Sequence, residues 1–154
     1  MPSRRLLSLL AVLATVVLIG CGDDAPSADD ARASYESVQS RLQDLGSDIG
    51  RQMQDARNQT NARLERAFEQ LQTRADEATE QLRDLDVPDD LADERDALRN
   101  AVDRGTDALA DVVQAVRDGD AEAAGEAAQQ LVEDSEAIRT AREKFEQALD
   151  AATG

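Results

Sequence analysis

The residue with the clearest chemistry in this chain is its single cysteine, Cys21. Residues 18–21 read Leu-Ile-Gly-Cys, the type of sequence that precedes a lipid-modified cysteine. Before it lie a basic start and an apolar run over residues 6–19, shorter than the roughly 20 residues that cross a bilayer as a helix. We therefore predict that residues 1–20 are a signal peptide cleaved after Gly20, and that the Cys21 thiol carries the lipid.

A lipidated Cys21 predicts where the protein is located. Two acyl chains give stable anchoring where one gives only reversible binding, so we expect a lipid anchor at the extracytoplasmic face of the cell membrane. Arg4 and Arg5 leave two export routes open, because a twin-arginine signal and an ordinary basic start look alike here. The polar segment 21–32 is predicted to be a flexible acidic tether.

The composition excludes several other kinds of chemistry. Acidic residues number 33 against 17 basic ones, for a formal net charge of −16. This excess repels phosphate groups, so we expect no nucleic-acid partner. Histidine is absent, which removes the commonest general acid–base and the commonest metal ligand. We accordingly expect no enzymatic activity and no cofactor.

One acidic segment begins like a calcium-binding loop but fails further on. Asp118, Asp120 and Glu122 alternate as the first ligands of such a loop do. Ala123 stands where the sharp turn needs glycine, and Gln129 stands where the bidentate glutamate belongs. The aspartates of the tether are interpreted as solvated linker, because a hard cation needs 6–8 oxygen ligands in a fixed geometry. The sequence therefore predicts no metal site.

The elements after the tether are predicted to be helices. Aromatic residues make up 2% of the chain, and Ala and Leu supply most of its apolar residues, as in long helices. Between residues 33 and 85 the apolar positions repeat every eleven residues and keep their phase across Gly46 and Gly50. Eleven residues are close to three helical turns, so this spacing predicts one long helix over residues 33–85.

Two further helices are predicted over residues of about 89–117 and 120–151. Pro88 starts the first of them, Gly119 suits the left-handed position after a helix, and Asp120 suits the next N-cap. A turn this short makes the two helices an antiparallel hairpin. The predicted fold class is all-α: a long N-terminal helix and a hairpin form a three-helix bundle over residues 33–154.

The predicted hairpin is about half as long as the first helix, so it can cover only the C-terminal half of the apolar stripe. The other half should then be bare, which a stripe of large apolar side chains does not favour. We expect this half to bind a second copy of the chain or a helical protein partner. The stripe consists of Val38, Leu42, Leu45, Ile49 and Met53.

Three motifs together resemble a known group of proteins: residues 18–21, the Pro88/Leu91/Leu98 pattern, and the turn at 118–120. With a short acidic tether and an Ala-rich last helix, the chain resembles the small α-helical lipoproteins of high-GC Gram-positive, actinobacterial type. The resemblance covers nearly the whole chain. It implies a location and a shape but no activity, since those proteins are mostly of unknown function.

Two functions follow from these predictions. The first is a membrane-anchored envelope lipoprotein that acts as a non-enzymatic helical binding or scaffolding module. The alternative is an amphipathic-helix protein that binds lipid or another apolar ligand, because eleven-residue amphipathic repeats resemble those of exchangeable apolipoproteins.

Overall fold

The computed structural model describes residues 26–154, so the predicted signal peptide, the cleavage at Gly20 and the lipidation of Cys21 lie outside the described residues. Four helices make up the described part, which contains no strand. They are α1 (Ala28–Asp55), α2 (Asn61–Arg83), α3 (Ala92–Asp118) and α4 (Ala121–Thr153). Short 3-10 helices, Ala56–Asn58 and Asp89–Leu91, precede α2 and α3. The predicted all-α class is confirmed.

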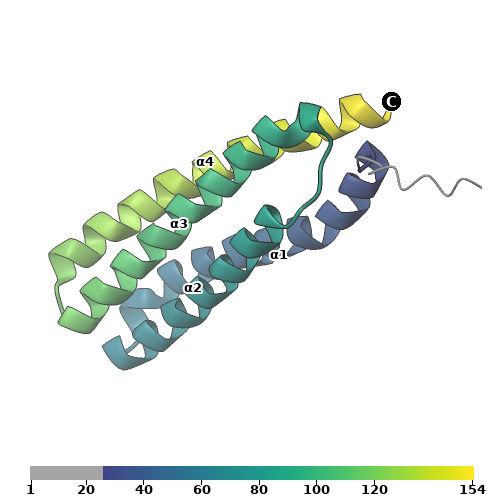
Figure 1. Cartoon of the computed structure of the whole chain (residues 1–154). Coiled ribbons are helices and arrows are strands. Elements are labelled where there is room, and N and C mark those ends of the chain that lie inside the picture. The colour runs from purple at the N-terminus through teal and green to yellow at the C-terminus, as the bar shows by residue number, and fades with distance from the viewer. Residues whose placement is uncertain (1–25) are drawn as a thin grey trace, which may run out of the picture.

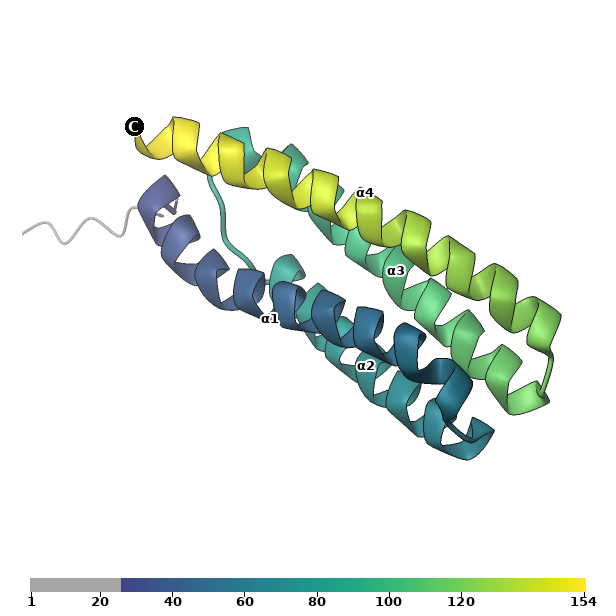
Figure 2. The ribbon, with the colours of Figure 1, turned by 180° about the vertical axis from the view of Figure 1, so that it is seen from behind.

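The helices run alternately up and down the long axis of the bundle (Figure 1). Helices α2 and α3 form one face, and α1 and α4 form the opposite face, as the reverse view shows (Figure 2). The start of α1 and the end of α4 lie at one end of the bundle, and the turns that join α1 to α2 and α3 to α4 lie at the other (Figure 1). We call the line along which α1 and α4 face each other the α1–α4 seam.

The prediction of a single helix over residues 33–85 is wrong. Helix α1 runs unbroken through Gly46 and Gly50, but it ends at Asp55, and the backbone is extended at Gln59 and Thr60. The break contains the run Asn-Gln-Thr-Asn at residues 58–61. Asn and Thr are weak helix formers that favour the capping positions at helix ends. The chain then folds back, and α1 and α2 form a second antiparallel hairpin.

The predicted bare stripe is also wrong, because this second hairpin covers it. Val38, Leu42, Leu45 and Ile49 are buried, and Met53 is half-buried against the same core. Val38 and Leu42 lie in one core cluster with residues of α2, and Leu45 and Ile49 lie in another. A spacing of eleven residues turns the same side chains inward in a straight helix and in a hairpin, so the spacing alone did not distinguish them.

The predicted tether over residues 21–32 is too long by several residues. Helix α1 begins at Ala28, and the Ser27 hydroxyl accepts a hydrogen bond from the backbone N–H of Asp30 at 3.1 Å. This is an ordinary N-cap interaction. Ala31, placed in the tether by the sequence analysis, is fully buried in the bundle.

The one predicted hairpin, formed by helices over about 89–117 and 120–151, is confirmed as α3 and α4 with small shifts at its ends. Gly119 adopts φ +70°, the left-handed conformation expected after a helix, and its N–H bonds the carbonyls at the end of α3. The Asp120 carboxylate accepts hydrogen bonds from the backbone N–H groups of Glu122 and Ala123 at 3.1 and 3.0 Å. That carboxylate therefore serves as a helix cap.

The core consists of two clusters that follow each other along the bundle. The terminal cluster lies near the start of α1 and the end of α4, and the turn cluster lies near the two hairpin turns. The terminal cluster contains Tyr35, Val38, Leu42, Leu82, Leu98, Val102, Phe145 and Leu149 among others. The turn cluster contains Leu45, Ile49, Phe68, Leu71, Leu109, Val112, Val116 and Leu131 among others. Within residues 26–154, no helix has the length and apolar content needed to span a membrane.

Candidate functional site

A cavity of about 270 Å³ lies on the α1–α4 seam, where the two core clusters meet. This volume is just below the ~300–1,000 Å³ that small-molecule sites usually occupy. Most of its lining is apolar. The α1 and α4 walls are formed by Leu42, Gln43, Leu45, Gly46 and Ile49, and by Leu131, Ser135, Ile138, Arg139 and Arg142. The remaining lining residues are Ala75 of α2 and Val102, Gly105, Thr106 and Leu109 of α3.

The cavity exists because every helix contributes a small residue at this level. These residues are Gly46 of α1, Ala75 of α2, Gly105 of α3 and Ser135 of α4. Gly105 is closely covered, since a Cβ atom built there would lie 2.9 Å from Cδ1 of Ile138. Gly46 is exposed, and a Cβ atom there would have no atom other than its own local backbone within 4 Å. Gly46 therefore lies where the cavity opens to solvent.

The two hydroxyl groups of the lining bond to their own helices. Thr106 Oγ1 donates a hydrogen bond to the carbonyl of Val102 at 3.0 Å, and Ser135 Oγ donates one to the carbonyl of Leu131 at 2.7 Å. Neither hydroxyl proton is therefore available to a bound molecule. The polar donors that remain in the lining are the side chains of Gln43, Arg139 and Arg142.

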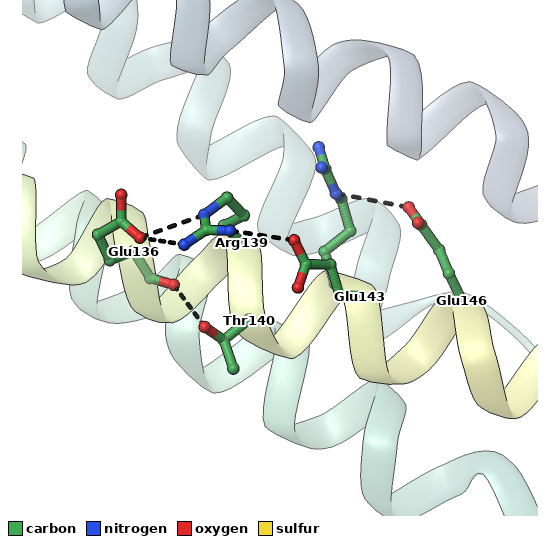
Figure 3. Close-up of polar contacts among 6 residues, drawn as sticks. Glu136, Arg139, Thr140, Glu143 and Glu146 are labelled. Carbon is green, nitrogen blue, oxygen red and sulfur yellow. Dashed lines mark hydrogen bonds and ion pairs between the residues drawn. The ribbon is translucent and has the colours of Figure 1, made fainter.

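The guanidinium of Arg139 already pairs with acidic side chains of its own helix. Its guanidinium donates to Oε2 of Glu136 from two nitrogens, one of them Nε at 3.1 Å, and to Oε1 of Glu143 from Nη1 at 3.2 Å (Figure 3). These contacts raise the pKa of Arg139, chiefly through the hydrogen bond to Glu136. Arg139 thus lies between two glutamates along the exposed side of α4.

The side chain of Arg142 is more buried than that of Arg139, and its guanidinium has fewer hydrogen-bond partners. Its side chain is 24% exposed, against 55% for Arg139. Within residues 26–154 its one ion pair runs from Nε to Oε1 of Glu146 at 3.4 Å, and this buried Nε has no hydrogen-bond partner. Burying a guanidinium nitrogen without an acceptor is costly, so an acceptor supplied at this place would be stabilising.

Beyond Arg142 the seam is closed by contacts between α1 and α4. The rings of Tyr35 and Phe145 meet edge to face with their centroids 4.8 Å apart. Gln39 Nε2 donates to Oε1 of Glu146 at 2.7 Å, and Arg32, near the start of α1, pairs with Asp150 near the end of α4. Burial raises the pKa of the Tyr35 phenol, and the charge of Glu146 adds to the rise. The cavity thus has a closed end on the side of the bundle where α1 starts and α4 ends.

Only part of the predicted partner-binding stripe belongs to this site. Leu42, Leu45 and Ile49 line the cavity, whereas Val38 and Met53 do not. Sequence reasoning did not find the contribution of α4, above all Ser135 and Arg142. Polar residues at inward positions of α4 were the available signal, but their meaning depends on which helix faces them.

No metal centre is indicated in the described part of the chain. Residues 26–154 contain no group of three or more acidic, cysteine or histidine side chains placed to hold a metal ion.

Comparison of the chain with protein families, with curated proteins and with solved structures gives no match. The cavity on the α1–α4 seam is therefore the feature of the described residues that points to a function.

Proposed function

We propose that this protein is a lipid-anchored, non-enzymatic binding module whose bundle takes up the apolar part of a small ligand in the α1–α4 cavity. The single observation that carries the proposal is the apolar cavity itself, open at Gly46 and lined by small residues from all four helices. Small residues from all four helices leave this space free, and its apolar lining offers contacts to an apolar group that enters it.

The proposed membrane anchor supports the same function. In the lipoprotein that we propose, Cys21 is followed by six residues before α1 begins at Ala28. Six extended residues span about 20 Å, so the bundle would remain close to the membrane surface. Apolar ligands are concentrated there. A bundle held near this supply can bind them without presenting an apolar face of its own.

The buried stripe removes the observation that favoured a scaffold. A helical partner or second copy was expected to cover the stripe from Val38 to Met53, and α2, α3 and α4 now supply that cover. Among residues 26–154 the one large apolar side chain that is strongly exposed is Val132, at 50%. The ligand-binding alternative is therefore the better supported of the two functions.

The cavity can be tested by closing it at Gly46. Gly46→Leu would place a side chain at the opening, where nothing contacts the Cβ position, and leucine also favours the helix. Gly50→Leu is the matched control, because Gly50 lies on the same helix with an equally open Cβ position but outside the cavity lining. The Cys21→Ser mature chain suits the test, since the whole described core lies within residues 26–154.

The measurement is the fluorescence of N-phenyl-1-naphthylamine, an uncharged probe that brightens in apolar surroundings. We expect saturable binding by the parent chain and by Gly50→Leu, and at least a tenfold loss, about 1.4 kcal/mol, in Gly46→Leu. Circular dichroism would establish that all three are folded. Absence of probe binding by the parent, or equal binding by both variants, would overturn the proposal.

A further inference from the structure

We infer that the ligand is a single acyl chain with an anionic head group, and that Arg142 binds this head group. The inference rests on the proposed function and specifies the ligand class of the same cavity. The shared chemistry is a carboxylate or phosphate joined to one apolar chain, as in a fatty acid or a lysophospholipid.

The shape of the cavity favours one chain. Along α4 its lining extends from Leu131 to Arg142, and eleven residues of helix rise by about 16 Å. Along α1 it extends from Leu42 to Ile49. A space of this length with a volume of about 270 Å³ suits one extended chain better than the two chains of a membrane phospholipid.

The polarity of the cavity changes along its length. The end near the hairpin turns is formed by Ile49, Leu109 and Leu131, which offer no hydrogen-bond donors from their side chains. Gln43 and Arg142 lie toward the closed end. This follows from the antiparallel register of α1 and α4, which Tyr35 with Phe145 and Gln39 with Glu146 establish. One end thus fits an apolar tail and the other fits a polar head.

The charge of the lining favours an anion. Its two charged residues are Arg139 and Arg142, although the chain as a whole has 33 acidic and 17 basic residues. The glutamates that pair with these arginines lie outside the lining. An ammonium head would meet like charges in this cavity, whereas a carboxylate or phosphate would meet opposite ones.

Arg142 is better placed than Arg139 to hold the head group. All three guanidinium nitrogens of Arg139 already donate hydrogen bonds to Glu136 or Glu143. Arg142 is more buried, and its one ion pair within residues 26–154 lacks hydrogen-bond geometry at Nε. A guanidinium has five N–H donors, and a planar anion can accept two of them side by side. Partial burial strengthens such a contact.

The test compares ligands that differ only in the head group. Myristate, 1-tetradecanol and a myristoyl lysophosphatidate would displace N-phenyl-1-naphthylamine from the Cys21→Ser mature chain, with the anions kept below their micelle concentrations and the alcohol below its solubility limit. We expect one or both anions to bind about tenfold or more tightly than the alcohol, as charge-assisted hydrogen bonds predict. The ratio of myristate to lysophosphatidate affinity shows which head group is preferred.

Two variants assign the preference to a residue. Arg142→Gln should bind the alcohol as the parent does and bind the anions no more tightly than the alcohol. Lys144→Gln, the matched control, also removes one positive charge from α4 but lies outside the lining, and it should keep the preference within about twofold, a difference below 0.5 kcal/mol.

The outcomes separate the inference from the proposed function. Equal affinity for the alcohol and both anions in the parent chain would overturn the inference, and this comparison needs no variant to fold. Retention of the preference in Arg142→Gln would overturn the role of Arg142. In either case, probe binding that is lost in Gly46→Leu would leave the proposed cavity function standing.

Discussion

Among single residues, Tyr35 is a buried titratable group on the α1–α4 seam. Its side chain is 2% exposed and packs edge to face on Phe145, and its hydroxyl has no hydrogen-bond partner within residues 26–154. Burial raises the pKa of the phenol, and the charge of Glu146 raises it further. The folded chain therefore retains the Tyr35 proton at a pH where the unfolded chain has lost it.

This difference predicts a loss of stability in alkali. Below about pH 10, Tyr35 is protonated in both states and contributes no pH dependence. Above about pH 10 only the unfolded state loses the proton, so the free energy of unfolding should fall by up to about 1.4 kcal/mol per pH unit until the folded-state pKa is reached. Urea unfolding between about pH 8 and pH 11 measures this slope.

Tyr35→Phe is the control for the alkaline effect. Because the hydroxyl has no hydrogen-bond partner in the described residues, its removal should change stability little near pH 8. The variant should then lose the part of the alkaline slope that belongs to Tyr35. An unchanged slope in Tyr35→Phe would show that other groups cause the alkaline loss.

Single residues also show what the sequence could and could not predict about the site. Leu42, Leu45 and Ile49 were correctly predicted to lie on one apolar face, because their spacing depends on α1 alone. The prediction that no part of the chain covers this face was wrong, because the cover depends on where the chain turns back between α1 and α2. Gly46 and Arg142 acquire their roles only when α1 lies beside α4, and no local pattern reveals that alignment.

At the scale of elements, the turns were predicted well where a residue with special backbone chemistry marks them. Gly119 and Asp120 ended and restarted a helix as expected. The break after Asp55 has no glycine or proline, and Thr60 makes no side-chain cap hydrogen bond at the start of α2. The polar run at residues 58–61 was the available signal, and the continuing apolar period outweighed it.

The turn between α3 and α4 yields a prediction with a matched control. Gly119→Ala should destabilise the bundle by about 1 kcal/mol, because a Cβ atom is strained at φ +70°. Gly125→Ala, inside α4 with open space around its Cβ position, should stabilise by up to about 1 kcal/mol. Urea unfolding of both variants compares them, and shifts of the same sign would contradict the assigned role of Gly119.

At the scale of the whole molecule, the number of helices was missed although the all-α class was predicted. Two helices of matched length were interpreted as one, and the resulting three-helix bundle left half of an apolar stripe without cover. That imbalance was itself a sign that the chain turns back. A four-helix arrangement resolves it, since each helix then has neighbours along its apolar face.

The unequal packing of the helices predicts where the molecule opens. Helix α3 has more buried residues than any other helix and packs between α2 and α4. Helix α1 instead borders the cavity over residues 42–49 and meets α4 mainly in its first half, near the end of α4. We expect amide hydrogen exchange to be slowest in α3 and faster in the cavity-lining part of α1.

A bound ligand should reduce that difference, because it binds the closed seam and stabilises it by mass action. With myristate present, protection should rise in residues 42–49 of α1 and 131–142 of α4, and the Gly46→Leu variant should show no such rise. Equal exchange in α1 and α3 without ligand would mean that the bundle opens only as a whole. A rise in protection spread evenly over all four helices would contradict binding at the α1–α4 seam.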